Sequence, residues 1–291
     1  MSEVEHILSV HNKLGEGPLW SVEEQVLYWV DIQDNCFFRF NPATGVSEKI
    51  DVGVAIGVLA LRASGGLVLA TKNGFAFWDK HTRELQYIVN PEATKPHMRF
   101  NDGAVDSTGR FWAGSMLADG SPHGEGTLYR LDPDGTVHTM ITGVGVPNGI
   151  GWSLDNTVMY FTDSVPRIIY AFNFDPATGN ITNRRNLIEV PEEIGTPDGL
   201  AVDSAGYIWS AFWDGAKIVR YAPSGKVDRV VAVPALHPTS CVFGGPDLDE
   251  LYITSSRADL NTDVLERYPL SGDLFRLKAG VTGREKFKFA G

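Results

Sequence analysis

Four polar residues recur at equivalent places along the chain. They are Glu16, Asn101, Asn148 and Asp198, and glycine follows each of them directly or after one residue. Carboxylate and amide oxygens are hard donors that suit Ca²⁺, Mg²⁺ or Mn²⁺ and tolerate Zn²⁺ or Fe²⁺. If the fold brings these side chains together, they could hold a divalent cation. Buried carboxylates without such a partner would be energetically costly.

The elements that would position these residues form an internal repeat. A short β-like run lies eleven to thirteen residues after each of them, and similar runs recur about every 45 residues. Within a repeat the apolar residues alternate with period two, and turn signals separate the strands. Four antiparallel strands per unit at this period are typical of β-propeller blades, and less so of a parallel β-helix or a large sandwich. The runs are centred on Trp29, Leu69, Trp112, Phe161, Trp209 and Ile253.

We therefore predict an all-β fold, a six-bladed β-propeller with four antiparallel strands per blade, in one domain over residues 1–291. Residues 7–10 are expected to complete the last blade, and residues 258–268 to include a short helix. The innermost strand of each blade borders the central channel, so the polar positions should converge on the axis. They would form there a hydrogen-bonded polar plug, a structural ion site or a functional metal site. The two remaining equivalent positions are Ile56 and Ser240.

Composition narrows the classes of partner. The formal net charge is −11 and no basic patch stands out in the sequence, which argues against a nucleic-acid binder. No apolar run is long enough for a membrane span, and we expect no signal peptide, because residues 1–6 do not form a basic region followed by an apolar stretch. The two cysteines, Cys36 and Cys241, are predicted to be free thiols in a cytoplasmic protein. We interpret the strand-end aspartates as turn formers and not as catalysts: Asp31, Asp106, Asp163 and Asp203.

Four segments together resemble a known family. They are residues 14–20 (LGEGPLW), 99–103 (RFNDG), 147–149 (PNG) and 197–200 (PDGL). In this order they are similar to the motifs of the SMP-30/gluconolactonase/LRE-like family, which includes regucalcin and bacterial sugar lactonases. The resemblance spans roughly residues 14–274.

This resemblance implies a divalent cation (Ca²⁺, Zn²⁺, Mn²⁺, Mg²⁺ or Fe²⁺) on the propeller axis, with Glu16, Asn148 and Asp198 as its protein ligands. It places Asn101 next to the ion, where it would help to hold substrate or water, and Arg99 against sugar hydroxyls. It also implies a substrate-covering loop at residues 117–126. In that loop Asp119 is our predicted substrate contact, with His123 and Glu125 as other acidic or polar stand-ins.

The activity implied by the resemblance is hydrolysis of a sugar-acid lactone, such as a glucono-, xylono-, arabino- or galactonolactone, to the aldonic acid. The ion would act as a Lewis acid on the carbonyl, and Asp198 as the general base. Asn101 and the ion would together hold the oxyanion. The partner would be a small lactone, with no nucleic acid or membrane, and the protein would be a monomer or a weak homo-oligomer.

The sequence leaves three other functions open. A related propeller hydrolase would act on aryl esters, phosphotriesters or acyl lactones and would need apolar contacts in its site. A strictosidine-synthase-like enzyme would be expected to be secreted and to carry a disulfide. A calcium-binding propeller without turnover would bind the ion and hydrolyse no lactone.

Overall fold

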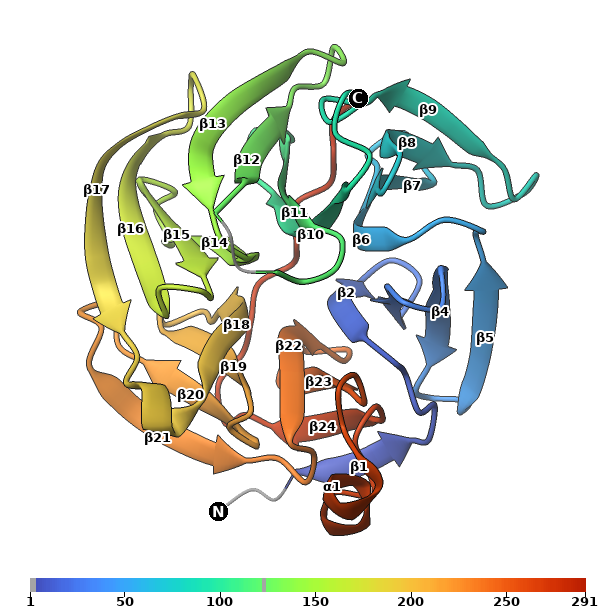
Figure 1. Cartoon of the computed structure of the whole chain (residues 1–291), viewed down its shortest axis with the longest axis vertical. Coiled ribbons are helices and arrows are strands. Elements are labelled where there is room, and N and C mark those ends of the chain that lie inside the picture. Colours follow the sequence, from blue (N-terminus) through green and yellow to red (C-terminus); the bar gives the residue numbers. More distant parts are fainter. Residues whose placement is uncertain (1–3, 122–123) are drawn as a thin grey trace.

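The structure is a computed structural model that describes residues 4–121 and 124–291. In this part of the chain, six four-stranded sheets stand around a central axis as blades (Figure 1). Within each blade, neighbouring strands pair in an antiparallel sense. The predicted six-bladed propeller with four strands per blade is therefore confirmed.

The strands follow one another outwards from the axis in each of the first five blades. Blade 1 consists of β2 (Gly15–Ser21), β3 (Val26–Asp31), β4 (Cys36–Asn41) and β5 (Val46–Asp51). Blade 2 consists of β6 (Ile56–Leu61), β7 (Leu67–Thr71), β8 (Gly74–Trp78) and β9 (Leu85–Val89). Blade 3 consists of β10 (Met98–Val105), β11 (Phe111–Leu117), β12 (Gly126–Leu131) and β13 (Val137–Val144). Blade 4 consists of β14 (Pro147–Trp152), β15 (Val158–Asp163), β16 (Ile168–Asp175) and β17 (Asn180–Glu189). Blade 5 consists of β18 (Thr196–Val202), β19 (Ile208–Trp213), β20 (Lys217–Tyr221) and β21 (Val227–Ala232). Blade 6 consists of β22 (His237–Gly244), β23 (Glu250–Ser256), β24 (Leu274–Lys278) and β1 (Glu5–Leu8).

The N-terminal strand closes the ring. β1 pairs with β24 as the outermost strand of blade 6, which confirms that the chain's start completes its last blade. The strand lies two residues earlier than predicted, and Asp273 provides the reason. Its Oδ1 accepts the backbone N–H groups of Val10 and His11, both at 3.0 Å. Those two amides are therefore unavailable to the strand ladder.

Buried tryptophans pack the blades against one another. Trp112 and Trp209 are fully buried, and each indole N–H donates to a buried aspartate, Asp106 or Asp203, at 2.9 Å. The same carboxylates accept backbone N–H groups of the following turns. These aspartates hold turns and indoles in place, in agreement with their interpretation as turn formers.

Helices are few in the described residues. α1 (Thr262–Arg267) lies within the predicted range, and a 3₁₀ turn covers Glu192–Ile194. No helix among the described residues is long and apolar enough to cross a membrane.

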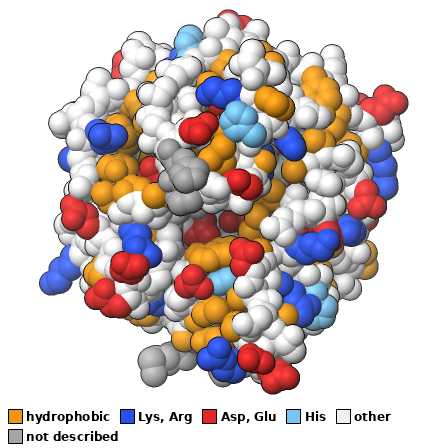
Figure 2. All heavy atoms as spheres, viewed as in Figure 1, with side chains coloured by type: hydrophobic (Ala, Val, Ile, Leu, Met, Phe, Trp, Pro, Cys, Tyr) orange, Lys and Arg blue, Asp and Glu red, His pale blue; other side chains and the backbone are white. Residues whose placement is uncertain are grey.

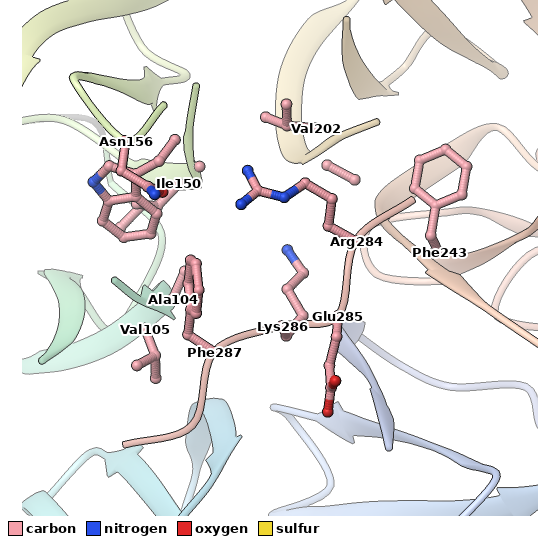
Figure 3. A pocket seen from close by; sticks show the side chains of 13 residues that line it. Ala104, Val105, Ile150, Asn156, Val202, Phe243, Arg284, Glu285, Lys286 and Phe287 are labelled. Atoms are coloured by element: carbon pink, nitrogen blue, oxygen red, sulfur yellow. The ribbon is translucent and has the colours of Figure 1, made fainter. Parts of the chain in front are cut away.

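A segment after β24 crosses one face of the ring, which the repeat pattern did not predict. In Figure 1 it runs behind the centre of the ring, from β24 towards β10. Gly283 N–H donates to Leu248 O at 2.7 Å in blade 6, and Phe289 N–H donates to Leu61 O at 2.8 Å in blade 2. The side chains of Arg284 and Lys286 point into a cavity beneath the inner strands (Figure 3). This segment, residues 279–291, closes the channel at the carboxyl ends of the inner strands.

Candidate active site

The innermost strands share one irregularity at the positions that the sequence singled out. In every blade the pairing register shifts within the first residues of the inner strand, as at a β-bulge. Such an irregularity breaks the alternation of side chains and redirects one of them. The shifts fall between Glu16 and Leu19, Ile56 and Val58, Phe100 and Gly103, Asn148 and Ile150, Pro197 and Leu200, and Pro238 and Ser240.

Glycines next to the bulges let neighbouring blades come close at the axis. A Cβ on Gly57 would lie 2.3 Å from the carbonyl oxygen of Asn101, and one on Gly199 would lie 2.1 Å from Ser240 Oγ. Both separations are far below van der Waals contact. Gly57 and Gly199 are therefore required by the narrow spacing of the inner strands, whereas Gly17, whose added Cβ would meet nothing nearer than 3.7 Å, is favoured by its positive φ of 53°.

Two aspartates fix the segments that lead into the site strands. Asp31 accepts the N–H groups of Lys13 and Leu14, at 2.8 and 3.1 Å. Asp163 does the same for residues 145 and 146, at 3.1 and 3.0 Å. Each carboxylate thereby anchors the approach to a strand that carries a predicted ligand, Glu16 in β2 or Asn148 in β14.

The predicted site residues meet in one axial cavity of about 420 Å³, a size usual for small-molecule sites. Figure 2 shows a hollow at the centre of the ring with acidic side chains inside it. Among the predicted residues, the cavity is lined by Glu16, Arg99, Asn101, Asn148, Asp198 and Asp119.

The loop at 117–126 borders the cavity through residues 118–120. Asp119 lines the cavity, but Glu125 does not, and its carboxylate lies 3.4 Å from His97 Nε2 instead. His123 lies outside the described residues. Sequence reasoning missed several other lining residues, because their positions in the repeat carry no recurring signal. They include Gln33, Ser164, Thr196, Trp213 and Asp259.

The carboxylates of the cavity are strongly perturbed. Burial, reinforced by the neighbouring Asp102 carboxylate, raises the pKa of Glu16 to about 8. Burial and the carboxylates of Glu16 and Asp102 raise the pKa of Asp198 well above its ordinary value. Asp198 Oδ1 is buried and has no hydrogen-bond partner in the described part of the chain. Bringing these acids together without a cation is therefore unfavourable.

The residues present fit a divalent cation. Glu16 uses Oε2 to accept the Gly17 N–H at 3.0 Å, which leaves Oε1, and Asp198 offers the unpartnered Oδ1. Within residues 4–121 and 124–291, no three His, Cys, Asp or Glu side chains are grouped to hold a metal ion. An amide oxygen could supply a third protein ligand, and Asn148 lines the same cavity.

A hydrogen-bonded chain orients the amides. Arg99 Nη1 donates to Asn101 Oδ1 at 2.7 Å and to Phe100 O at 3.0 Å. Asn101 Nδ2 donates to Pro147 O at 2.9 Å and to Asn148 Oδ1 at 3.0 Å. Both amide hydrogens of Asn101 are thus in use, and in this arrangement none is left for an oxyanion. Arg99 keeps free donors, since its Nε and Nη2 have no hydrogen-bond partner among the described residues.

A second acidic group lies deeper in the channel. Asp102 follows Asn101 in β10, and burial raises the pKa of its carboxyl to about 6, while its own bond to Gly103 N–H and the charge of Lys286 oppose the rise. Burial lowers the pKa of Lys286, whose ammonium lies in the same small cavity as Asp102. The C-terminal segment therefore places the Lys286 side chain beneath the axial carboxylates.

These features define a β-propeller whose axis carries a polar, acid-lined cavity at the amino ends of its inner strands. The SMP-30/gluconolactonase/LRE-like model matches residues 14–257, and the chain belongs to this family. The resemblance deduced from the four motifs is thereby confirmed.

Individual relatives match over nearly their whole length. The pentonolactonase XacC of Haloferax volcanii is 39% identical over 292 residues, covering 98% of this chain and 97% of the relative. Regucalcin of Xenopus laevis is 36% identical, covering 99% of both chains. Among solved structures, a calcium-binding regucalcin from Agrobacterium tumefaciens superposes with a TM-score of 0.95 at 27% identity, covering 99% of this chain and 97% of that one.

Proposed function

We propose that this protein is a metal-dependent lactonase that hydrolyses a sugar-acid lactone to its aldonic acid. The observation that carries the proposal is the axial cavity, where the buried Asp198 Oδ1 has no partner beside the raised-pKa carboxyl of Glu16. A cation would satisfy both groups. A similar chain of nearly equal length is named a pentonolactonase, which supports the choice of reaction.

Glu16, Asn148 and Asp198 would hold the ion, which would be Ca²⁺, Zn²⁺, Mn²⁺, Mg²⁺ or Fe²⁺. When bound, the ion would polarise the lactone carbonyl and lower the pKa of a water molecule. A similar solved structure is described as a calcium-binding regucalcin, which supports the proposal that this chain binds a divalent cation.

Asp198 is assigned as the general base. Asp198 carries a buried carboxyl group that lines the cavity, and a carboxylate in that place could remove a proton from attacking water. The water oxygen bonds to the carbonyl carbon and the ring C–O bond breaks. The proton then passes from Asp198 to the departing hydroxyl oxygen.

Arg99 is assigned the substrate-facing donor role. Its side chain lines the cavity, and burial lowers the pKa of its guanidinium to about 10, so it remains charged at neutral pH. Its unused N–H groups suit the hydroxyl oxygens of a sugar or the developing oxyanion. We assign this donor role to Arg99 instead of Asn101, whose amide hydrogens are already engaged.

A calcium-binding propeller without turnover is the second candidate. The Agrobacterium structure, described as a calcium-binding protein, superposes over nearly the whole chain and favours it. An esterase for aryl or phosphotriester substrates is less suited to a cavity lined by Gln33, Asp119 and Asp259.

The proposal is tested with a panel of aldonolactones and protein stripped of metal. Proton release is recorded after adding Ca²⁺, Zn²⁺, Mn²⁺, Mg²⁺ or Fe²⁺ in turn. We expect one ion to restore hydrolysis of a glucono-, xylono-, arabino- or galactonolactone above its spontaneous rate. Ion binding with no turnover of any lactone would instead establish the non-catalytic candidate.

Replacing Arg99 with alanine is expected mainly to raise KM, by about 10- to 100-fold. The loss corresponds to one or two charge-assisted hydrogen bonds to substrate. Steady-state kinetics on the preferred lactone measures it, and Arg83→Ala, which removes an exposed arginine paired with Glu48, is the control. An unchanged KM in the Arg99 variant would remove its substrate role.

A further inference from the structure

We propose that Ser164 is a positioning residue that holds the amide of Asn148 with its oxygen available to the axial ion. The inference rests on the proposed function, since it concerns the ion site. Ser164 follows β15 directly, is buried and lines the axial cavity.

One end of the hydrogen-bonded chain fixes the direction of the amides. Arg99 has donors only, so the Asn101 atom that faces it must be oxygen. The Asn101 atom facing Pro147 O must therefore be nitrogen, since a carbonyl oxygen only accepts. That nitrogen also donates to Asn148, so the Asn148 atom it meets is Oδ1.

Ser164 fixes the other end. Its hydroxyl donates to Pro197 O at 2.7 Å, and a hydroxyl has a single hydrogen. Towards Asn148 the serine can therefore only accept, which it does from Nδ2 at 2.8 Å. Turning the amide by 180° would set an Asn148 nitrogen against the donating Asn101 nitrogen. It would also set an oxygen against a serine that has no hydrogen left.

The arrangement leaves a free lone pair on Asn148 Oδ1 and links two ligand-bearing strands. A carbonyl oxygen has two lone pairs, and Asn101 uses only one of them. Through Pro197 O, Ser164 also ties Asn148 in β14 to the residue that precedes Asp198 in β18. Groups that orient metal ligands in this way commonly contribute 10- to 100-fold, roughly, to metal affinity.

The first test measures the dissociation constant of Ca²⁺ by calorimetry on protein stripped of metal. Ser164→Ala is expected to weaken binding by about 10-fold or more. Ser164→Thr keeps the hydroxyl and is expected to stay much closer to the wild type. Ser21→Ala is the matched control, because Ser21 is also a buried strand serine, and its Oγ accepts the Glu24 N–H at 3.2 Å and does not line the cavity.

A double-mutant cycle separates orientation from general damage. In Asn148→Asp both terminal atoms are oxygens, so turning the group no longer changes what the ion meets. Adding Ser164→Ala to this variant is therefore expected to weaken Ca²⁺ binding far less than it does in the wild-type background. An equal loss in both backgrounds, or no loss in the wild-type background, would overturn the inference. If the wild-type protein itself binds no divalent ion, the proposed function fails, and the inference falls with it.

Discussion

Substitution of Asp198 by asparagine is expected to reduce lactone hydrolysis by about 10²- to 10⁴-fold, the range contributed by a general base. The amide has nearly the same shape but cannot take the proton of an attacking water. It also removes one of the two charges that attract the ion, so Ca²⁺ affinity should fall as well. Asp198→Ala should abolish turnover and weaken ion binding, because it removes the ligand oxygens as well as the charge. Steady-state kinetics and calorimetry on the same preparations measure the two effects.

A buried aspartate away from the site provides the control. Asp203 lies one residue beyond β18 and holds the indole of Trp209 and the guanidinium of Arg220. Asp203→Asn should lower the temperature of unfolding and leave kcat and Ca²⁺ affinity of the folded protein unchanged. Near-normal turnover in Asp198→Asn would contradict its assignment as base.

Removal of the ion is expected to destabilise the protein increasingly as the pH rises. Glu16 has a pKa of about 8 in the folded chain and an ordinary value of 4.5 when unfolded. Between these values the folded state binds more protons than the unfolded state, so the free energy of unfolding falls as pH increases. Asp198, whose pKa is also raised, acts in the same direction. Thermal unfolding of chelator-treated protein between pH 6 and 9 measures the effect.

Return of the ion should reverse this loss. At a free ion concentration of about 100 times Kd, mass action adds about 2.7 kcal/mol to the free energy of unfolding. For a chain of this length that corresponds to about 4 °C in Tm. Glu16→Gln cannot ionise, so its stripped form should show a shallower decline with pH. A wild-type protein whose Tm responds neither to chelation nor to added ion would argue against an axial metal.

The fold could be predicted because each blade repeats one local pattern. Alternating strands and turn residues such as those at residues 132–135 specify a blade locally, and the count of repeats specifies the ring. The crossing segment could not be predicted, because it belongs to no repeat. Phe289 pairs with Leu61 across more than two hundred residues, and nothing in its neighbourhood signals that partner.

The site was predictable only where its residues follow the repeat. Glu16, Asn148 and Asp198 occupy equivalent places in the repeat, so symmetry brings them to the axis. Their chemical state depends on side chains outside that symmetry, such as Ser164. Sequence alone also could not show that the hydrogens of Asn101 are consumed by its neighbours, since this depends on how adjacent blades pack.

The crossing segment also bears on how the chain reaches this state. β1 is synthesised before blades 1 to 5 but has no partner until β24 has been made, and residues 283–290 dock on blades 2, 3 and 6. The ring can therefore close only after β24 has left the ribosome, and its lower face can be covered only after residues 283–290 have followed. Blades 1 to 5 must wait in an open arc with exposed strand edges, which are the surfaces most prone to aggregation. Opening of the native ring requires both the pairing of β1 with β24 and the contacts of residues 283–290 to break, so it should be slow.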